Sequence, residues 1–185
     1  MTTLNHYFIN QLKKLKEADD RAALAALRRG LGQPPGHTPE MHPYVVPFLP
    51  KNAYPNSWVE QSYYTVASLY GLHPDMGTGE NLGYHFAQTL DPNPDYNQAI
   101  ERRFSALLTA HPDDMAFYLR QAISFLKAKD VAVNWHQLLW DVLHWGDPYR
   151  QPEVQKRWAG GFWRRSSRDD TEATTEPETE EPVGE

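Results

Sequence analysis

Residues 134–146 read Asn-Trp-His-Gln-Leu-Leu-Trp-Asp-Val-Leu-His-Trp-Gly and give the clearest sign of secondary structure in this chain. Their apolar side chains recur at steps of three and four residues, which is the spacing of one face of an α-helix. The predicted buried face consists of Trp135, Leu138, Leu139, Val142 and Leu143. We therefore expect a helix from Asn134 to about residue 145.

The same spacing extends to both sides of this stretch, and no run of strand-type alternation or internal repeat is present. The chain is therefore predicted to be all-α and to form one compact multi-helix domain. Further helices are expected at about residues 4–17, 19–31, 42–49, 57–71, 81–90, 95–108, 112–126 and 149–165. Asp19, Ser57 and Asp95 are the predicted N-caps, because their side chains can accept a backbone N–H at a helix start.

Charge divides the chain of 185 residues, whose net charge is -6. Residues 167–185 contain eight acidic residues and one basic residue, Arg168, so 17 basic and 16 acidic residues remain in the rest. The acidic segment is rich in Glu, Thr and Pro and cannot bury enough apolar surface to offset its conformational entropy. We expect a helical domain over residues 1–166 and a disordered acidic tail over residues 167–185.

Composition excludes several kinds of chemistry. The chain has no cysteine, so it contains no disulfide, thiolate nucleophile or cysteine-ligated metal. Its N-terminal segment lacks the uninterrupted apolar core of a signal peptide, and no stretch approaches the ~18 apolar residues that span a bilayer. A cytoplasmic protein without membrane contact is expected.

Basic residues gather in three doublets: Arg28-Arg29, Arg102-Arg103 and Arg164-Arg165. The planar guanidinium group suits phosphate, because it can donate two parallel hydrogen bonds. Adjacent residues on a helix point about 100° apart, so only one arginine of each doublet can lie on a narrow binding face. The alternative is that the doublets are solvated or pair with carboxylates.

Signals for an enzyme are weaker. His111-Pro112-Asp113-Asp114 resembles the zinc-ligand motif of a deacetylase family, but here it lies between two predicted helices. A proline in the first turn of a helix, with carboxylates near the positive end of the helix dipole, accounts for the same string. We expect no catalytic residue, metal or cofactor, and a hydrolase is the least favoured hypothesis.

Six short strings, taken in order, point to a known family. They are Ala-Ala-Leu-Arg-Arg-Gly (25–30), Asn-Leu-Gly (81–83), Glu-Arg-Arg-Phe (101–104), Leu-Arg (119–120), the stretch 134–146, and Val-Gln-Lys-Arg-Trp-Ala-Gly-Gly-Phe (154–162). Over roughly residues 5–165 the chain thereby resembles CasB, the small subunit of the type I-E CRISPR surveillance complex, Cascade. One departure follows Asn-Leu-Gly, where the family commonly has a basic residue and this chain has Tyr84 and His85.

The resemblance implies an all-helical, non-catalytic subunit that stabilises the R-loop. Its implied partners are CRISPR RNA and target DNA, the backbone and large subunits of the complex, and a second copy of itself. The implied contacts are with the displaced DNA strand and the guide–target duplex. The nucleic-acid-binding residues carried across are Arg28, Arg29, Arg102, Arg103, Arg120, Lys156 and Arg157.

Three further expectations stay open at this point. The alternative function is a helical protein–protein interaction scaffold without direct nucleic-acid binding. The C-terminal tryptophans are expected to pack in the core, with Trp140 and Trp163 as the surface exceptions, since they fall off the main apolar stripes. The acidic tail is hypothesised to fold back over the basic residues of the last helix and suppress non-specific binding.

Overall fold

A computed structural model describes residues 6–51 and 53–172, with side chains up to residue 164. This part of the chain contains α-helices and short 3-10 turns but no β-strand, which confirms the all-α prediction. The single extended pairing is an isolated bridge between Met76 and Val133. None of the described helices combines the length and apolar character that crossing a bilayer requires.

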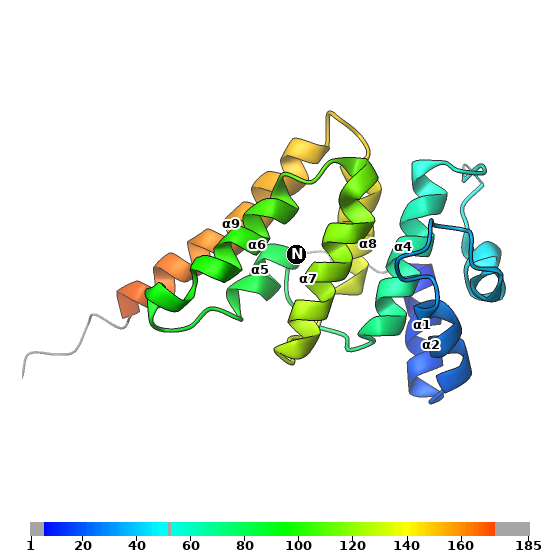
Figure 1. The fold of residues 1–185 in the computed structure, drawn as a ribbon, viewed down its shortest axis with the longest axis horizontal. Helices are drawn as coiled ribbons and strands as arrows, with labels where there is room; N and C mark the ends of the chain where they lie inside the picture. The colour runs from blue at the N-terminus through cyan, green and yellow to red at the C-terminus, as the bar shows by residue number, and fades with distance from the viewer. Residues whose placement is uncertain (1–5, 52, 173–185) are drawn as a thin grey trace, which may run out of the picture.

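Nine α-helices make up the described part (Figure 1). They are α1 (Tyr7–Glu17), α2 (Arg21–Arg28), α3 (His42–Val45), α4 (Trp58–Leu72), α5 (Leu82–Ala87), α6 (Gln98–Leu108), α7 (Met115–Ala128), α8 (Trp135–Trp145) and α9 (Gln151–Glu172). Helices α7 and α8 lie in the middle, with α5, α6 and α9 on one side and α1, α2 and α4 on the other. Helix α4 contacts α2, α7 and α8, whereas α9 packs on α5, α6 and α8.

The helix caps agree with the sequence at one predicted position and differ at two. The Ser57 side chain accepts a backbone N–H of the first turn of α4, as predicted. Asp19 is not a cap; Asp20 accepts the corresponding bond in α2, while Asp19 adopts a φ of 49° just before it. Asp95 is also not the cap of α6, because it lies inside a 3-10 turn that precedes the helix.

The tryptophans behave as predicted. Three have no exposed surface: Trp135, Trp145 and Trp158. Trp140 is partly buried and Trp163 is 40% exposed, so these two are the surface exceptions. Leu143 was predicted to belong to the buried face of α8 but is only partly buried, because Trp145, three residues after Val142, fills the core there instead.

Helices α5 and α9 cross in backbone contact. A β-carbon at Gly83 would overlap the carbonyl oxygen of Trp158, and one at Gly161 would lie 2.8 Å from the backbone nitrogen of Tyr84. The Asn81 side chain ties the crossing together, since its Oδ1 accepts the Tyr84 N–H (3.1 Å) and its Nδ2 donates to the Arg157 carbonyl (3.2 Å). The strings Asn-Leu-Gly and Gly-Gly-Phe are thus the two sides of one helix contact.

The last helix runs further than the sequence predicted. Helix α9 continues to Glu172, whereas the sequence predicted its end at about residue 165. The physical reason is that no glycine or proline lies between Phe162 and Glu172 to end the helix. The domain boundary after residue 166 stays a prediction. Residues 173–185 lie outside the described residues, so the disorder and the fold-back of the tail stay predictions there.

Candidate nucleic-acid interface

Two cationic side chains from different helices converge on the C-terminal end of α4. Arg28, at the end of α2, donates from Nε to the Gly71 carbonyl (3.0 Å), and Lys127, near the end of α7, donates from Nζ to the Leu72 carbonyl (2.8 Å). These carbonyls belong to the last two residues of α4. The C-terminus of a helix carries partial negative charge, so it holds both cations side by side despite their mutual repulsion.

A third cation extends this group along α7. Arg120 precedes Lys127 by seven residues, which places both on one face of the helix about 10 Å apart along its axis. The Arg120 guanidinium lies against the loop after α2, where a β-carbon at Gly32 would be 2.6 Å from Nη1. Gly32 has a φ of +78°, so glycine suits this position for conformation and for space. We call Arg28, Arg120 and Lys127 the α7 cluster.

Helix α7 carries no acidic residue between Met115 and Ala128. Its exposed polar side chains between the cations are uncharged, namely Gln121 and Ser124. Within α7 itself no carboxylate lies between Arg120 and Lys127, and the nearest along the chain are Asp114 and Asp130, just outside its two ends. A surface with cations and no interspersed anions concentrates a positive potential that attracts polyanions.

The first arginine doublet is divided between two partners. Arg28 turns toward α4, whereas Arg29 pairs with Glu40 at 3.1 Å, with side chains that are 63% and 48% exposed. The division follows from the 100° step between neighbouring helix residues. Because the Arg29–Glu40 pair is solvated, it is weak and leaves Arg29 able to exchange its partner.

The second doublet lies on the other side of α7. The Arg103 guanidinium, from α6, stands 4.4 Å from the centre of the Phe125 ring of α7. Arg102 donates from Nε to the Gln98 carbonyl (3.3 Å) and borders a shallow hollow on α6. Basic side chains therefore flank α7 on both sides, from the end of α4 to α6. Figure 1 shows α4 and α6 on opposite sides of α7.

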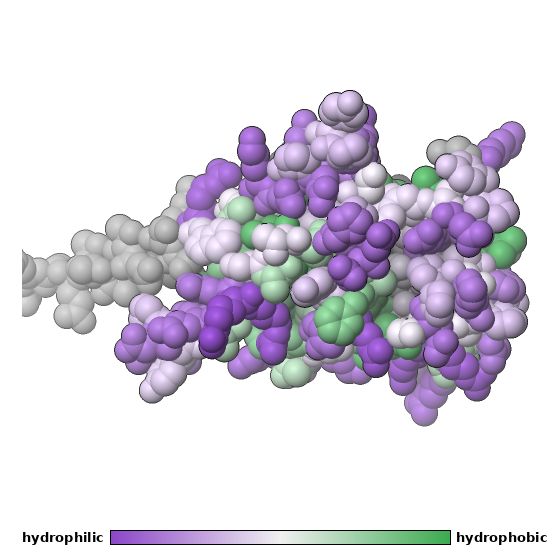
Figure 2. Space-filling model, turned by 45° about the horizontal axis from the view of Figure 1, so that its top comes forward, coloured by the Kyte–Doolittle hydropathy of each residue, from purple (hydrophilic) through white to green (hydrophobic). Residues whose placement is uncertain are grey.

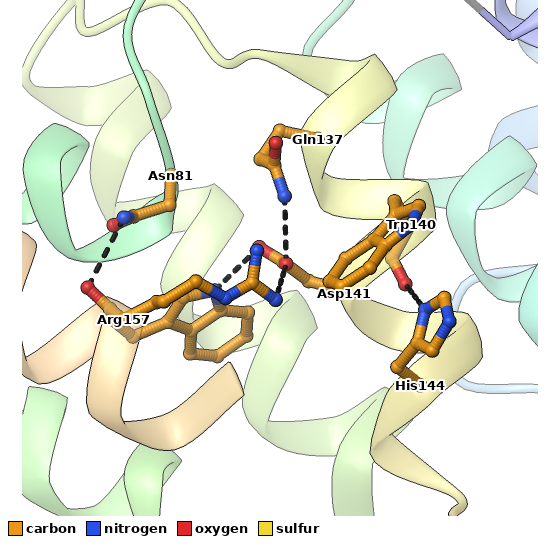
Figure 3. A network of polar contacts seen from close by, with 7 residues as sticks. Asn81, Gln137, Trp140, Asp141, His144 and Arg157 are labelled. Atoms are coloured by element: carbon orange, nitrogen blue, oxygen red, sulfur yellow. Dashed lines mark hydrogen bonds and ion pairs between the residues drawn. The ribbon is translucent and has the colours of Figure 1, made fainter. Parts of the chain in front are cut away.

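Lys156 and Arg157 differ in what they contact. Lys156 is exposed and has no ion pair in the described structure. Arg157 is bound inside the protein: its Nη2 lies 3.0 Å from Oδ1 of the fully buried Asp141, and its guanidinium stands 4.2 Å from the centre of a Trp140 ring (Figure 3). The structure thus gives Arg157 a role in joining α8 to α9.

Asp141 is the centre of this α8–α9 contact. Its carboxylate accepts hydrogen bonds from Gln137 Nε2 (2.9 Å) and Trp158 Nε1 (2.6 Å) in addition to Arg157 (Figure 3). Burial raises the pKa of Asp141 to about 6, although the three donors favour the charged form. At neutral pH the group is an ionised carboxylate with its partners in place.

Replacing Arg157 with glutamine is expected to lower the free energy of unfolding by about 2–3 kcal/mol, because the buried Asp141 loses its charged partner. Lys156→Gln, one residue away on the exposed side of α9, should change it by less than about 0.5 kcal/mol. Urea unfolding followed by circular dichroism at pH 7.5 gives both values. Equal stability of the two variants would contradict the assignment of Arg157 to the α8–α9 contact.

The His111-Pro112-Asp113-Asp114 string forms the start of α7. Residues Pro112–Asp114 make a 3-10 turn before the helix, and His111 Nδ1 accepts the Asp113 N–H at 3.3 Å. This arrangement agrees with the interpretation of the string as a helix start. Among the residues that the structure describes, no group of three or more His, Asp or Glu side chains is placed to hold a metal ion.

His85, at the position where a basic residue was expected, is buried. Its Nε2 accepts the backbone N–H of Asn134 at 3.0 Å, which places the ring proton on Nδ1. Burial lowers the pKa of His85 to about 4, so the ring is neutral at physiological pH. His85 therefore links α5 to the start of α8 and does not offer a phosphate contact.

Lys127 is the basic residue that sequence reasoning missed. Its spacing of seven from Arg120 was an available signal, because the two lie on one helix face. Its bond to the end of α4 was not predictable, since it depends on how α7 packs against α4.

Comparison with known proteins places the chain in a family. Residues 23–163, which include the basic residues of the candidate interface, match the family described as CRISPR-associated protein Cse2. The chain belongs to the Cse2 family. CRISPR-associated protein Cse2 of Thermus thermophilus is 36% identical over 157 residues, covering 84% of this chain and 88% of that protein. The family predicted from the ordered strings is thereby confirmed.

Solved structures of the Cse2 family agree with the fold. The crystal structure of CasB from Thermus thermophilus has a TM-score of 0.71 at 36% identity and covers 85% of this chain and 96% of its own. A chain in a structure named CRISPR RNA-guided surveillance complex has a TM-score of 0.73 at 27% identity, covering 93% of this chain and 99% of its own.

Proposed function

We propose that this Cse2-family protein is a non-catalytic subunit of a CRISPR RNA-guided surveillance complex and holds nucleic-acid backbone at the α7 cluster. The observation that carries the proposal is the convergence of Arg28 and Lys127 on the end of α4, with Arg120 on the same face of α7 as Lys127. Family membership supports it, as does the similar chain in a solved surveillance complex.

Backbone contacts are the physical means by which such a subunit stabilises the R-loop. In guide-directed recognition, base pairing reads the sequence while protein contacts the backbone and its shape. Exchange of the DNA duplex for the guide–target duplex is nearly balanced, so a few phosphate contacts shift it. The proposed partners are CRISPR RNA, the target DNA with its displaced strand, the backbone and large subunits, and a second copy of the chain, in the cytoplasm.

The basic residues differ in the part we assign to them. The α7 cluster makes the central contacts, and the flanking arginines extend them on both sides: Arg29, Arg102 and Arg103. Lys156 is an exposed contact on α9, separate from this cluster. Arg157 belongs first to the α8–α9 contact, and any phosphate would have to share it with Asp141. The proposal involves no metal or cofactor.

Figure 2 shows the polar character of one face of the molecule, without distinguishing cations from anions. Hydrophilic side chains cover most of this face, with only small hydrophobic areas between them (Figure 2).

Replacing all three members of the α7 cluster with glutamine should weaken target-DNA binding by the assembled complex by roughly 10- to 100-fold at ~0.1 M salt. The slope of log affinity against log salt should fall by about 2–3, since each lost phosphate contact removes ~0.7–0.9. Binding is measured by filter retention of labelled target DNA across a salt series. Arg102→Gln alone should reduce the slope by less than one unit.

Lys13→Gln is the matched control, because Lys13 is exposed on α1 and pairs there with Glu17 at 3.4 Å. An unchanged slope in the triple variant, with the subunit still incorporated, would remove the contact assignment. Absence of single-stranded DNA binding by the free wild-type protein at low salt would favour the interaction scaffold instead.

A further inference from the structure

A cleft of about 330 Å³ opens beside the α7 cluster. One wall is the loop of residues 30–36, and the floor is formed by α4, including Tyr64 and Ser68. The other wall is the first half of α7, where Phe117 and Arg120 line the cleft. Phe117 is 60% exposed, which is unusual for a phenylalanine in a folded domain.

The loop wall of the cleft is rich in glycine and proline. Gly32 and Gly36 both have positive φ, +78° and +80°, and Pro34 and Pro35 lie between them. Glycine adopts this backbone without strain, and proline fixes φ, so the loop presents backbone of defined shape to the cleft. A β-carbon at Gly32 would press on the Arg120 guanidinium, which shows how closely arginine and loop approach.

Three side chains on the lining, those of Phe117, Arg120 and Asp113, can bind parts of a nucleotide. The exposed ring of Phe117 offers a face on which an unpaired base can stack. The guanidinium of Arg120 has no hydrogen-bond or ion-pair partner among the described side chains, so its donors are available to a phosphate. Asp113, also on the lining, can accept a hydrogen bond from an exocyclic amino group of a base.

Other occupants use these groups less completely. An apolar peptide segment would leave the Arg120 guanidinium without a polar partner, and a free phosphate would not engage Phe117. A volume of about 330 Å³ is at the lower end of ligand pockets, which suits one nucleotide and excludes a base pair.

We infer that this cleft receives a single unpaired nucleotide of the displaced DNA strand, with its base against Phe117 and its phosphate on Arg120. The inference rests on the proposed function and extends it, because the α7 cluster follows the backbone whereas the cleft captures one base. Capturing a base that has left the duplex opposes re-pairing of the displaced strand. Asp113 favours bases that carry an amino group over thymine.

The test uses the assembled complex, in which the guide fixes the register of the displaced strand. A series of target DNAs carries one abasic residue at successive positions of that strand. We expect one position at which the abasic residue weakens binding roughly 5- to 100-fold with the wild-type subunit. With Phe117→Leu the overall affinity should fall by a similar factor and the abasic residue at that position should have no further effect.

Two variants make the outcome specific. Phe117→Tyr keeps a ring for stacking and should retain the position dependence, whereas Tyr149→Leu, at an aromatic residue that is 89% exposed in the loop before α9, should behave as wild type. The melting temperature of Phe117→Leu should match that of the wild-type protein, since the ring is largely exposed.

Each contrary result has its own meaning. If Phe117→Leu binds every DNA of the series like the wild type while the triple cluster variant keeps its reduced salt slope, the cleft inference is overturned and the proposed function stands. If neither variant affects DNA binding, the proposed function itself fails. If Phe117→Leu instead impairs incorporation of the subunit, the cleft takes a protein segment and the inference is wrong.

Discussion

Gly83→Ala is expected to destabilise the protein by at least about 3 kcal/mol, because the added methyl group has no room at the α5–α9 crossing. The β-carbon would overlap the Trp158 carbonyl oxygen and approach the carbonyl carbon to 2.7 Å. Both are backbone atoms, so relief requires the two helices to separate, and no side chain can simply rotate away. Separation would also break the Asn81 hydrogen bond to the Arg157 carbonyl.

Two adjacent glycines of α9 provide a matched test. A β-carbon at Gly161 would lie 2.5 Å from Asn81 Oδ1 and 2.8 Å from the Tyr84 nitrogen, so Gly161→Ala should cost about 2–3 kcal/mol. At Gly160 the nearest atoms belong to the flexible end of Arg164. Gly160→Ala should therefore be neutral or stabilising by up to about 1 kcal/mol, because alanine favours the helix.

Urea unfolding of the three variants, followed by circular dichroism, measures these changes. Equal stability of Gly160→Ala and Gly161→Ala would mean that Gly161 does not pack against Asn81 and Tyr84 as closely as the structure shows. A Gly83→Ala protein as stable as the wild type would contradict the crossing itself.

Two buried groups, His85 and Asp141, should change the free energy of unfolding in opposite directions as the pH falls. His85 is neutral when folded, with its pKa lowered by burial from 6.5 to about 4, so the unfolded chain takes up its proton first as the pH falls. Stability is therefore lost between pH 6.5 and 4, by up to about 3 kcal/mol.

Asp141 has its pKa raised by burial from 3.8 to about 6, so at this group the folded chain takes up the proton before the unfolded chain does. Stability is gained from this group between pH 6 and 4, by a similar amount.

Substituting either Asp141 or His85 should leave the pH dependence of the other group visible in the free energy of unfolding. With Asp141→Asn, the free energy of unfolding should fall by about 3 kcal/mol more than in the wild type between pH 6.5 and 4, each protein being referred to its own value at pH 7. With His85→Gln it should rise over the same interval, apart from the losses contributed by His6 and His136, whose pKa values burial also lowers.

Urea titrations at half-unit pH steps provide the curves. His37→Gln is the matched control, since His37 is an exposed histidine outside these contacts. Parallel curves for the wild type and Asp141→Asn would contradict the raised pKa of Asp141.

The sequence predicts the helices well because their apolar spacing is a local property. It does not predict contacts between distant helices, and these decide the meaning of several strings. Asn-Leu-Gly and Gly-Gly-Phe both fall within predicted helices, but neither string shows which other helix it contacts. Only the crossing of α5 over α9 shows that Gly83 and Gly161 are required by close packing.

The same limit applies to the candidate site. The residues Arg28 and Arg29 are equivalent in sequence, yet one meets the end of α4 and the other meets Glu40. Arg157 matches a family string as well as Lys156 does, but a buried carboxylate 16 residues earlier in the chain binds it. Charge can be read from the sequence, whereas the partner that engages each charge depends on packing.

The carbonyls at the end of α4 have a further consequence for how the α7 cluster binds. Lysine and arginine side chains each carry about 2 kcal/mol of rotamer entropy, which an unrestrained side chain loses when it binds a phosphate. Arg28 and Lys127 are already oriented by the Gly71 and Leu72 carbonyls, and each retains donors that the carbonyl does not use. If the α7 cluster holds nucleic-acid backbone as proposed, much of the ordering cost is thus met during folding.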